Sequence, residues 1–99
     1  MRRGTTPTHT FKTDLDLTTA EVIYITYEQG DKVVFEKTKE DLTVTAEEIT
    51  LDLTQADTLA LSPIGKVYFQ IRAKLPGGKA VASNIMECPA KKILKNGVI

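Results

Sequence analysis

The stretch KVYFQIRAKLPGGKAVASNIMEC, residues 66–88, decides the fold class of this chain. Apolar and polar side chains alternate from Val67 to Lys74, which is the period of a strand buried on one face. The Pro-Gly-Gly signal at residues 76–78 predicts a turn, and a second strand-like run follows it. The alternation of that run changes phase near Ser83, which predicts a β-bulge. The stretch therefore predicts a hairpin of two antiparallel strands.

A second hairpin is expected over residues 21–38. Its first half, EVIYITYE, is β-branched and aromatic, as strands prefer, and Gly30 and Asp31 mark the turn. Further short strands or extended segments are predicted where apolar residues alternate or cluster: 9–17, 42–44, 49–53 and 93–94.

One short helical turn is expected near residues 54–60. Thr54 with Asp57 three positions later is typical of a capping box, and Pro63 and Gly65 follow. About seven strands spaced roughly 8–12 residues apart then predict an all-β fold, and we expect an immunoglobulin-like β-sandwich. We expect one domain over residues 1–99, with residues 1–7 as a flexible arm.

The composition indicates a folded protein, because 41% of the residues are hydrophobic and 26% are charged. No apolar run approaches the roughly 20 residues that a membrane-spanning helix needs. Arg2 and Arg3 are not followed by an apolar segment, so we expect no secretory signal. The single cysteine excludes an intramolecular disulfide bond. Synthesis in the cytoplasm fits these features.

The charge is balanced overall but not along the chain. The formal net charge is zero, which argues against nucleic-acid binding through bulk charge. Residues 1–57 carry 12 acidic and 6 basic side chains, whereas residues 58–99 carry 7 basic and 1 acidic. One interpretation is that the sheets mix these charges in space. The other is a bipolar subunit that stacks on a copy of itself or on a partner.

No catalytic, cofactor or metal site is expected. A hydrolytic triad needs a base beside its nucleophile, and His9, the only histidine, is expected at a strand edge or surface. Cys88 is expected to be a buried small hydrophobe. One histidine and one cysteine are too few for an ordinary zinc site. The paired carboxylates, Asp14/Asp16, Glu40/Asp41 and Glu47/Glu48, are interpreted as solvated surface.

The three tyrosines suggest a second class of function. Tyr24, Tyr27 and Tyr68 are expected to pack in the core and on the sheet faces. A concave patch of such rings would instead indicate a small module that binds a carbohydrate or cell-surface ligand.

Several motifs carry a resemblance to a known group. The start MRRGTTPTHTF, the run VIYITYEQGDKVVFEKT and residues 53–99 resemble small proteins encoded in prophages of Gram-positive bacteria, beside tail and baseplate genes. The later part also resembles the N-terminal sandwich domain of upper baseplate proteins of lactococcal-type phages. The matching motifs there are residues 54–59, Gln70-Ile71-Arg72, Gly77-Gly78 and Ser83-Asn84-Ile85. Those baseplate proteins continue into long receptor-carrying regions, whereas the sequence in hand has 99 residues.

The resemblance implies a phage structural protein that assembles into a tail or baseplate through protein–protein contacts. It would contact other phage proteins or itself, bind neither nucleic acid nor membrane, and move from the host cytoplasm into the virion. Exposed strand edges can add strands from a neighbour. The expected partner contacts are the polar stripe of the hairpin and the apolar end of the sequence: Gln70, Arg72, Lys74, Val98 and Ile99. Burial of Val98 and Ile99 is expected, in this chain or in the next one.

Overall fold

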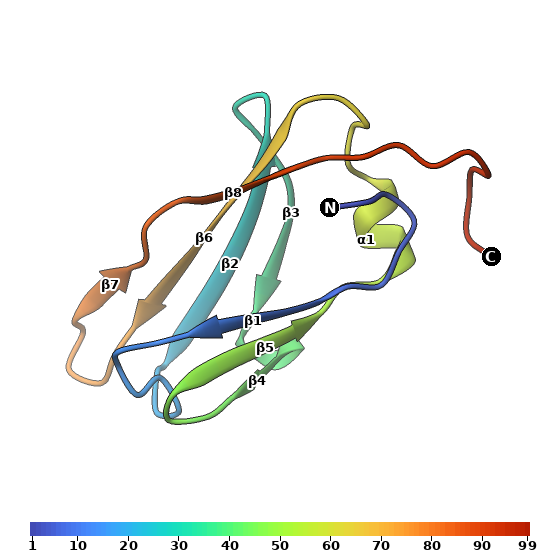
Figure 1. Ribbon diagram of the computed structural model, residues 1–99. Helices are drawn as coiled ribbons and strands as arrows, with labels where there is room; N and C mark the ends of the chain where they lie inside the picture. The colour runs from blue at the N-terminus through green and yellow to red at the C-terminus, as the bar shows by residue number, and fades with distance from the viewer.

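The computed structural model describes all residues, 1–99, as two antiparallel sheets that face each other (Figure 1). The three-stranded sheet has the order β1-β5-β4, and the five-stranded sheet has the order β3-β2-β6-β7, with β8 also pairing with β6. The strands are β1 (Thr8–Lys12), β2 (Val22–Gln29), β3 (Lys32–Thr38), β4 (Leu42–Val44), β5 (Glu48–Asp52), β6 (Lys66–Lys74), β7 (Ala80–Ala82) and β8 (Met86–Pro89). The chain is thus an immunoglobulin-like β-sandwich, as the strand spacing predicts.

The core lies between the two sheets. Alternate residues of β2 point inward, and Ile23, Ile25 and Tyr27 are fully buried. They face buried side chains of the smaller sheet, among them Ile49 and Leu51 of β5. Burial of each such side chain contributes about 1.5–3 kcal/mol. The alternation of apolar residues along each strand therefore determines which face of each sheet packs against the other sheet.

The β2–β3 hairpin closes with a tight turn. Gly30 and Asp31 both have positive φ, 55° and 61°, the signature of a two-residue type I′ turn. This turn matches the right-handed twist of the flanking strands. The predicted hairpin and its turn residues are confirmed.

The hairpin of residues 66–88 carries the predicted bulge. Phe69 pairs with Met86 and Arg72 pairs with Ala82, so three steps on β6 oppose four steps on the partner strand. At the extra residue, the Ser83 amide donates to the Ile71 carbonyl at 2.9 Å. The Ile71 amide donates to Ser83 Oγ at 3.0 Å. β7 and β8 are therefore one strand interrupted by a bulge.

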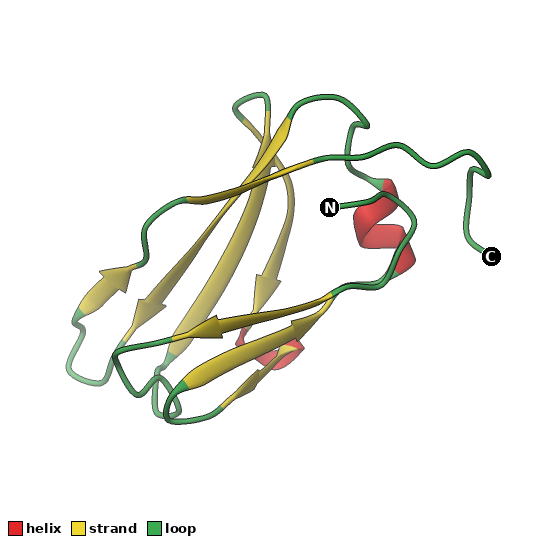
Figure 2. Cartoon of the chain, in the orientation of Figure 1, coloured by secondary structure: helices red, strands yellow, loops and turns green.

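A short helix, α1 (Gln55–Leu59), carries the chain from the smaller sheet to the larger one (Figure 2). The capping box is present: the Asp57 amide donates to Thr54 Oγ1 at 3.1 Å, and the Thr54 amide donates to Asp57 Oδ2 at 2.9 Å. The ammonium of Lys37 forms an ion pair with Asp57 at 2.9 Å. Neither α1 nor the 3₁₀ turn η1 (Lys39–Asp41) is long and apolar enough to cross a membrane.

The first residues lie against the segment that follows β8. The Arg3 amide donates to the Lys91 carbonyl at 3.0 Å. The Arg3 guanidinium donates to the carbonyls of Leu59 and Leu61, at 3.0 and 2.7 Å, and so satisfies acceptors at the end of α1. Residues 1–7, expected to be a flexible arm, thus have defined hydrogen-bond partners, while their mobility stays a prediction.

The prediction of a strand at residues 93–94 is wrong. Beyond β8 the only β-type pairing is an isolated parallel bridge between Arg2 and Lys91. The half-buried Ile93 side chain packs beside Gly4, and Leu94 is 94% exposed. Two adjacent apolar residues resemble a strand in sequence, but here no neighbouring strand offers a ladder to join.

Candidate functional site

β1 is an edge strand that pairs with β5 on one side only. Hydrogen bonds toward β5 run from the Thr13 amide to the Glu47 carbonyl, 2.9 Å, and from the Leu53 amide to the Pro7 carbonyl, 3.0 Å. Pairing alternates along an antiparallel strand, so the even positions between them direct their N–H and C=O groups away from β5. These free backbone groups belong to Thr8, Thr10 and Lys12.

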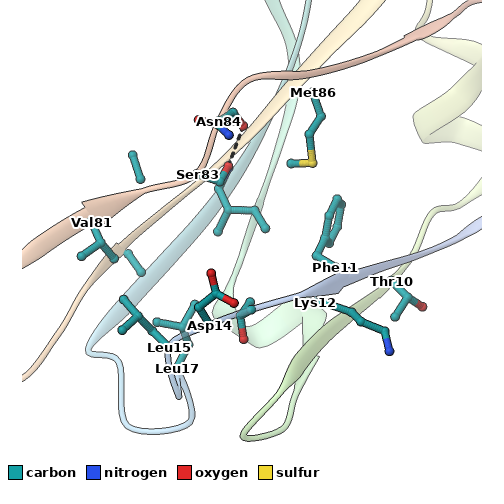
Figure 3. Close-up of a pocket in the computed structure, with 14 residues that line it drawn as sticks. Thr10, Phe11, Lys12, Asp14, Leu15, Leu17, Val81, Ser83, Asn84 and Met86 are labelled. Atoms are coloured by element: carbon teal, nitrogen blue, oxygen red, sulfur yellow. Dashed lines mark hydrogen bonds between the residues drawn. The ribbon is translucent and has the colours of Figure 1, made fainter.

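A groove of about 580 Å³ opens beside this edge, between β1 and the bulged β7–β8 strand (Figure 3). Eight of its 14 lining residues are hydrophobic, so an occupant would gain mainly by burying apolar surface. The apolar lining comes from both sheets and includes Phe11, Leu17, Ile71, Val81 and Met86.

Polar groups lie among these apolar residues. Thr13 lines the groove, and its Oγ1 is buried without a hydrogen-bond partner. An unpaired buried hydroxyl is unfavourable, and this oxygen is covered by the chain itself rather than open to the groove. Ser83 and Asn84 line the opposite side, where the Ser83 hydroxyl donates to the Asn84 carbonyl at 2.8 Å (Figure 3). The groove can therefore accept an extended, partly polar chain.

The other sheet edges carry features that discourage strand addition. β4 has three residues, and β8 ends in Pro89 after the bulge. The pairing of β2 with β3 is irregular at Tyr27 and Glu28, and β3 carries three charged side chains, Lys32, Glu36 and Lys37. Short length, proline, bulges and charges are the usual protections of an edge. β1 has five residues, no proline, no bulge and one charge, Lys12, so it is the least protected edge.

An aromatic cluster lies beneath β1. His9 is on the edge strand, as expected, but its half-buried ring stacks on Tyr27 and Phe69, with centroids 5.8 Å away in both cases. A hydrogen bond of 2.7 Å joins His9 Nδ1 to the Tyr27 hydroxyl. Burial lowers the pKa of His9 and raises the pKa of Tyr27. The His9 ring is therefore part of the packing between the two sheets.

The predicted polar stripe does not act as one surface. Gln70 is half-buried, and its Nε2 donates to the Ser83 carbonyl at 2.8 Å. Arg72 is exposed on β6, and the exposed Lys74 approaches Glu21 to 4.0 Å. Of these three side chains, only Arg72 has no hydrogen-bond or ion-pair partner.

The apolar residues Val98 and Ile99 are 68% and 90% exposed. They are therefore not buried within this chain, and burial against another chain stays a prediction.

Cys88 is half-buried, 3.8 Å from the Met1 amine nitrogen. No group of three histidine, cysteine or carboxylate side chains is placed to hold a metal ion.

The β1 edge and the groove were not identified from the sequence. The sequence feature that points to them is the alternation of His9, Phe11 and Thr13. If the backbone groups of these residues pair with a neighbouring strand, those of the residues between them point away from that strand. This signal is incomplete, because the sequence does not show which neighbour β1 pairs with. The bulge near Ser83, in contrast, could be predicted, and it forms one wall of the groove.

No protein-family model and no curated protein matches the chain. Among solved structures, the V domain of amphioxus IgVJ-C2 is similar over 94% of this chain and 97% of that chain, with 14% identity and a TM-score of 0.39. This likeness is too distant to assign a function, and the fold assignment rests on the two sheets described above.

Proposed function

We propose that this chain is a small, non-catalytic structural module of a phage or prophage particle, in the tail or baseplate. It would act through protein–protein contacts, residing in the host cytoplasm before assembly and in the virion afterwards. The observation that carries the proposal is the free edge of β1 beside an apolar groove. An edge with free N–H and C=O groups is a ready template for a strand from another chain.

The particle context comes from the sequence motifs. The motifs at residues 54–59, 70–72, 77–78 and 83–85 resemble those of upper baseplate domains. In the structure they form α1 with its N-cap, part of β6, the β6–β7 turn and the bulge. These are scaffold elements rather than chemical groups, which suits a module whose role is to be assembled.

The groove also supports the alternative of a ligand-binding module. Its volume of about 580 Å³ falls within the range of small-molecule sites, roughly 300–1,000 Å³. A carbohydrate needs an aromatic platform, yet Phe11 is the only aromatic residue in the lining and is 9% exposed. Tyr24 and Tyr68, 42% and 36% exposed, lie outside the groove. The observations therefore favour a protein partner over a sugar.

Mass spectrometry of particles purified after prophage induction tests the proposed function. The proposal predicts a fixed copy number of this chain per particle, relative to the major tail proteins. A chain that is expressed during induction but absent from washed particles would contradict the structural role. Glycan-array binding at micromolar concentration would instead support the ligand-binding alternative.

A further inference from the structure

A segment of this same chain has the properties of an occupant for the groove. Residues 94–99, the sequence LKNGVI, extend beyond the sandwich (Figure 1). Leu94, Val98 and Ile99 are 94%, 68% and 90% exposed. Exposed large apolar side chains on neighbouring positions mark an interaction segment. The only hydrogen bonds from this segment to the rest of the chain join Ile99 to the half-buried Gln55 side chain.

The spacing of this segment fits strand addition. Successive side chains of a strand point to opposite faces, so Leu94, Asn96 and Val98 would share one face. Two apolar residues would then enter the apolar groove, with an amide between them. That amide would face a groove whose lining also holds polar residues, Thr13, Ser83 and Asn84 among them. The backbone would meanwhile pair with the free groups of Thr10 and its neighbours on β1.

The occupant is expected to come from a second copy. Residues 94–99 lie beside α1, whereas the groove lies toward β7 at the other end of the sandwich (Figure 1). Six fully extended residues span about 20 Å, and the molecule is 47 Å long. The segment therefore points away from the groove of its own chain and is free to meet another.

Charge favours the same pairing. Residues 91–99 carry three lysines and no acidic residue. The edge strand, the turns beside it and the first residue of β5 carry one lysine and four carboxylates: Lys12, Asp14, Asp16, Glu47 and Glu48. Opposite charges on the two surfaces accelerate encounter and help to set the register.

We infer that residues 94–99 of one copy add as a strand to the free edge of β1 in a second copy, with Leu94 and Val98 filling the groove. The inference rests on the proposed function, because it names the partner and the contact that assembly would use. The contact joins two different surfaces, so repetition gives a closed ring or an open filament.

A fluorescent peptide of residues 91–99, titrated into the full chain at a concentration where the chain is monomeric, tests this contact. We expect saturable binding, with slower amide exchange at Thr8, Thr10 and Lys12. A peptide with Leu94→Asp and Val98→Asp should bind about tenfold more weakly or worse. The full-chain variant Thr10→Pro should show the same loss, because its ring blocks the outer edge while the position makes no hydrogen bond to β5.

Val33→Asp in the full chain is the control, since it alters an exposed valine of β3, away from the groove. It should bind the peptide like the unaltered chain. Absence of binding, or equal binding by the altered peptide and by Thr10→Pro, would overturn the inference. If the chain is nevertheless found in particles, the proposed function stands and only this contact fails. If the peptide binds but the chain is absent from particles, the contact stands and the virion role fails.

Discussion

His9 Nδ1 lies 2.7 Å from the phenolic oxygen of Tyr27, so the single histidine of the chain is hydrogen-bonded to a side chain that is fully buried. The hydroxyl of Tyr27 would otherwise face an apolar interior. His9 thus provides a hydrogen-bond partner for the Tyr27 hydroxyl while its own ring stacks on Phe69. This contact joins the edge strand β1 to the central strand β2.

Replacing His9 should destabilise the fold, because the buried Tyr27 hydroxyl loses its hydrogen-bond partner. His9→Phe keeps an aromatic ring but leaves a buried hydroxyl without a partner, at a cost of about 1–3 kcal/mol in the free energy of unfolding. The double variant His9→Phe with Tyr27→Phe removes both polar partners and should recover much of that loss. Urea unfolding followed by circular dichroism measures both. Equal stabilities of the single and double variants would show that the bond contributes little.

The lowered pKa of His9 predicts that the free energy of unfolding depends on pH. Burial holds the pKa of His9 below its ordinary value of 6.5. The unfolded chain therefore binds this proton more readily than the folded chain. The contribution of neutral His9 to the free energy of unfolding should be fully present above pH 6.5. It should decrease as the pH falls below that value, toward the lower pKa of the folded state. The double phenylalanine variant should lack this slope in unfolding experiments between pH 7 and 5, and a slope that persists would assign it to another group.

Asp57 links the helix cap to a neighbouring strand. Burial acts to raise its pKa, but the hydrogen bond from the Thr54 backbone and the ion pair with Lys37 outweigh burial and hold the pKa below the ordinary 3.8. Its contribution should therefore be present above pH 3.8 and should be lost as the pH falls through the folded-state pKa.

Asp57→Ala removes the ion pair with Lys37 and the carboxylate that accepts from the Thr54 amide, while the bond from the residue-57 amide to Thr54 Oγ1 remains. The expected loss is about 1–2 kcal/mol. Asp57→Asn keeps an acceptor for the Thr54 amide and should lose less. Thermal unfolding at pH 7 compares the two variants. An alanine variant no less stable than the asparagine variant would contradict the capping role.

Gly4 has a left-handed backbone conformation at a point where two distant segments pack closely. Its φ is +72°, and a Cβ built there would lie 2.7 Å from Cδ1 of Ile93. Gly4→Ala should therefore cost the roughly 1–2 kcal/mol of left-handed backbone strain, with a small further loss because the end of the Ile93 side chain must move aside. Gly97→Ala is the control, because Gly97 has φ +88° but nothing within 4 Å of the added Cβ. Similar unfolding midpoints for the two variants would show that the contact with Ile93 is dispensable.

The features predicted from sequence are those set by local rules. The cap formed by Thr54 and Asp57 depends on residues three positions apart, and the bulge near Ser83 depends on the phase of one strand. The free edge of β1 depends on which strand lies beside Phe11 and which does not, and that information is not local. The expected strand at residues 93–94 failed for the same reason, because Leu94 has no neighbour to pair with.

Sedimentation equilibrium of the full chain, at several protein concentrations and at low and high salt, tests the central claim most directly. Assembly through an apolar groove with complementary charges predicts species larger than one chain that grow with concentration. Their association should weaken as salt screens the lysines from the carboxylates. A single-chain mass at every concentration and ionic strength would contradict self-assembly through the β1 edge.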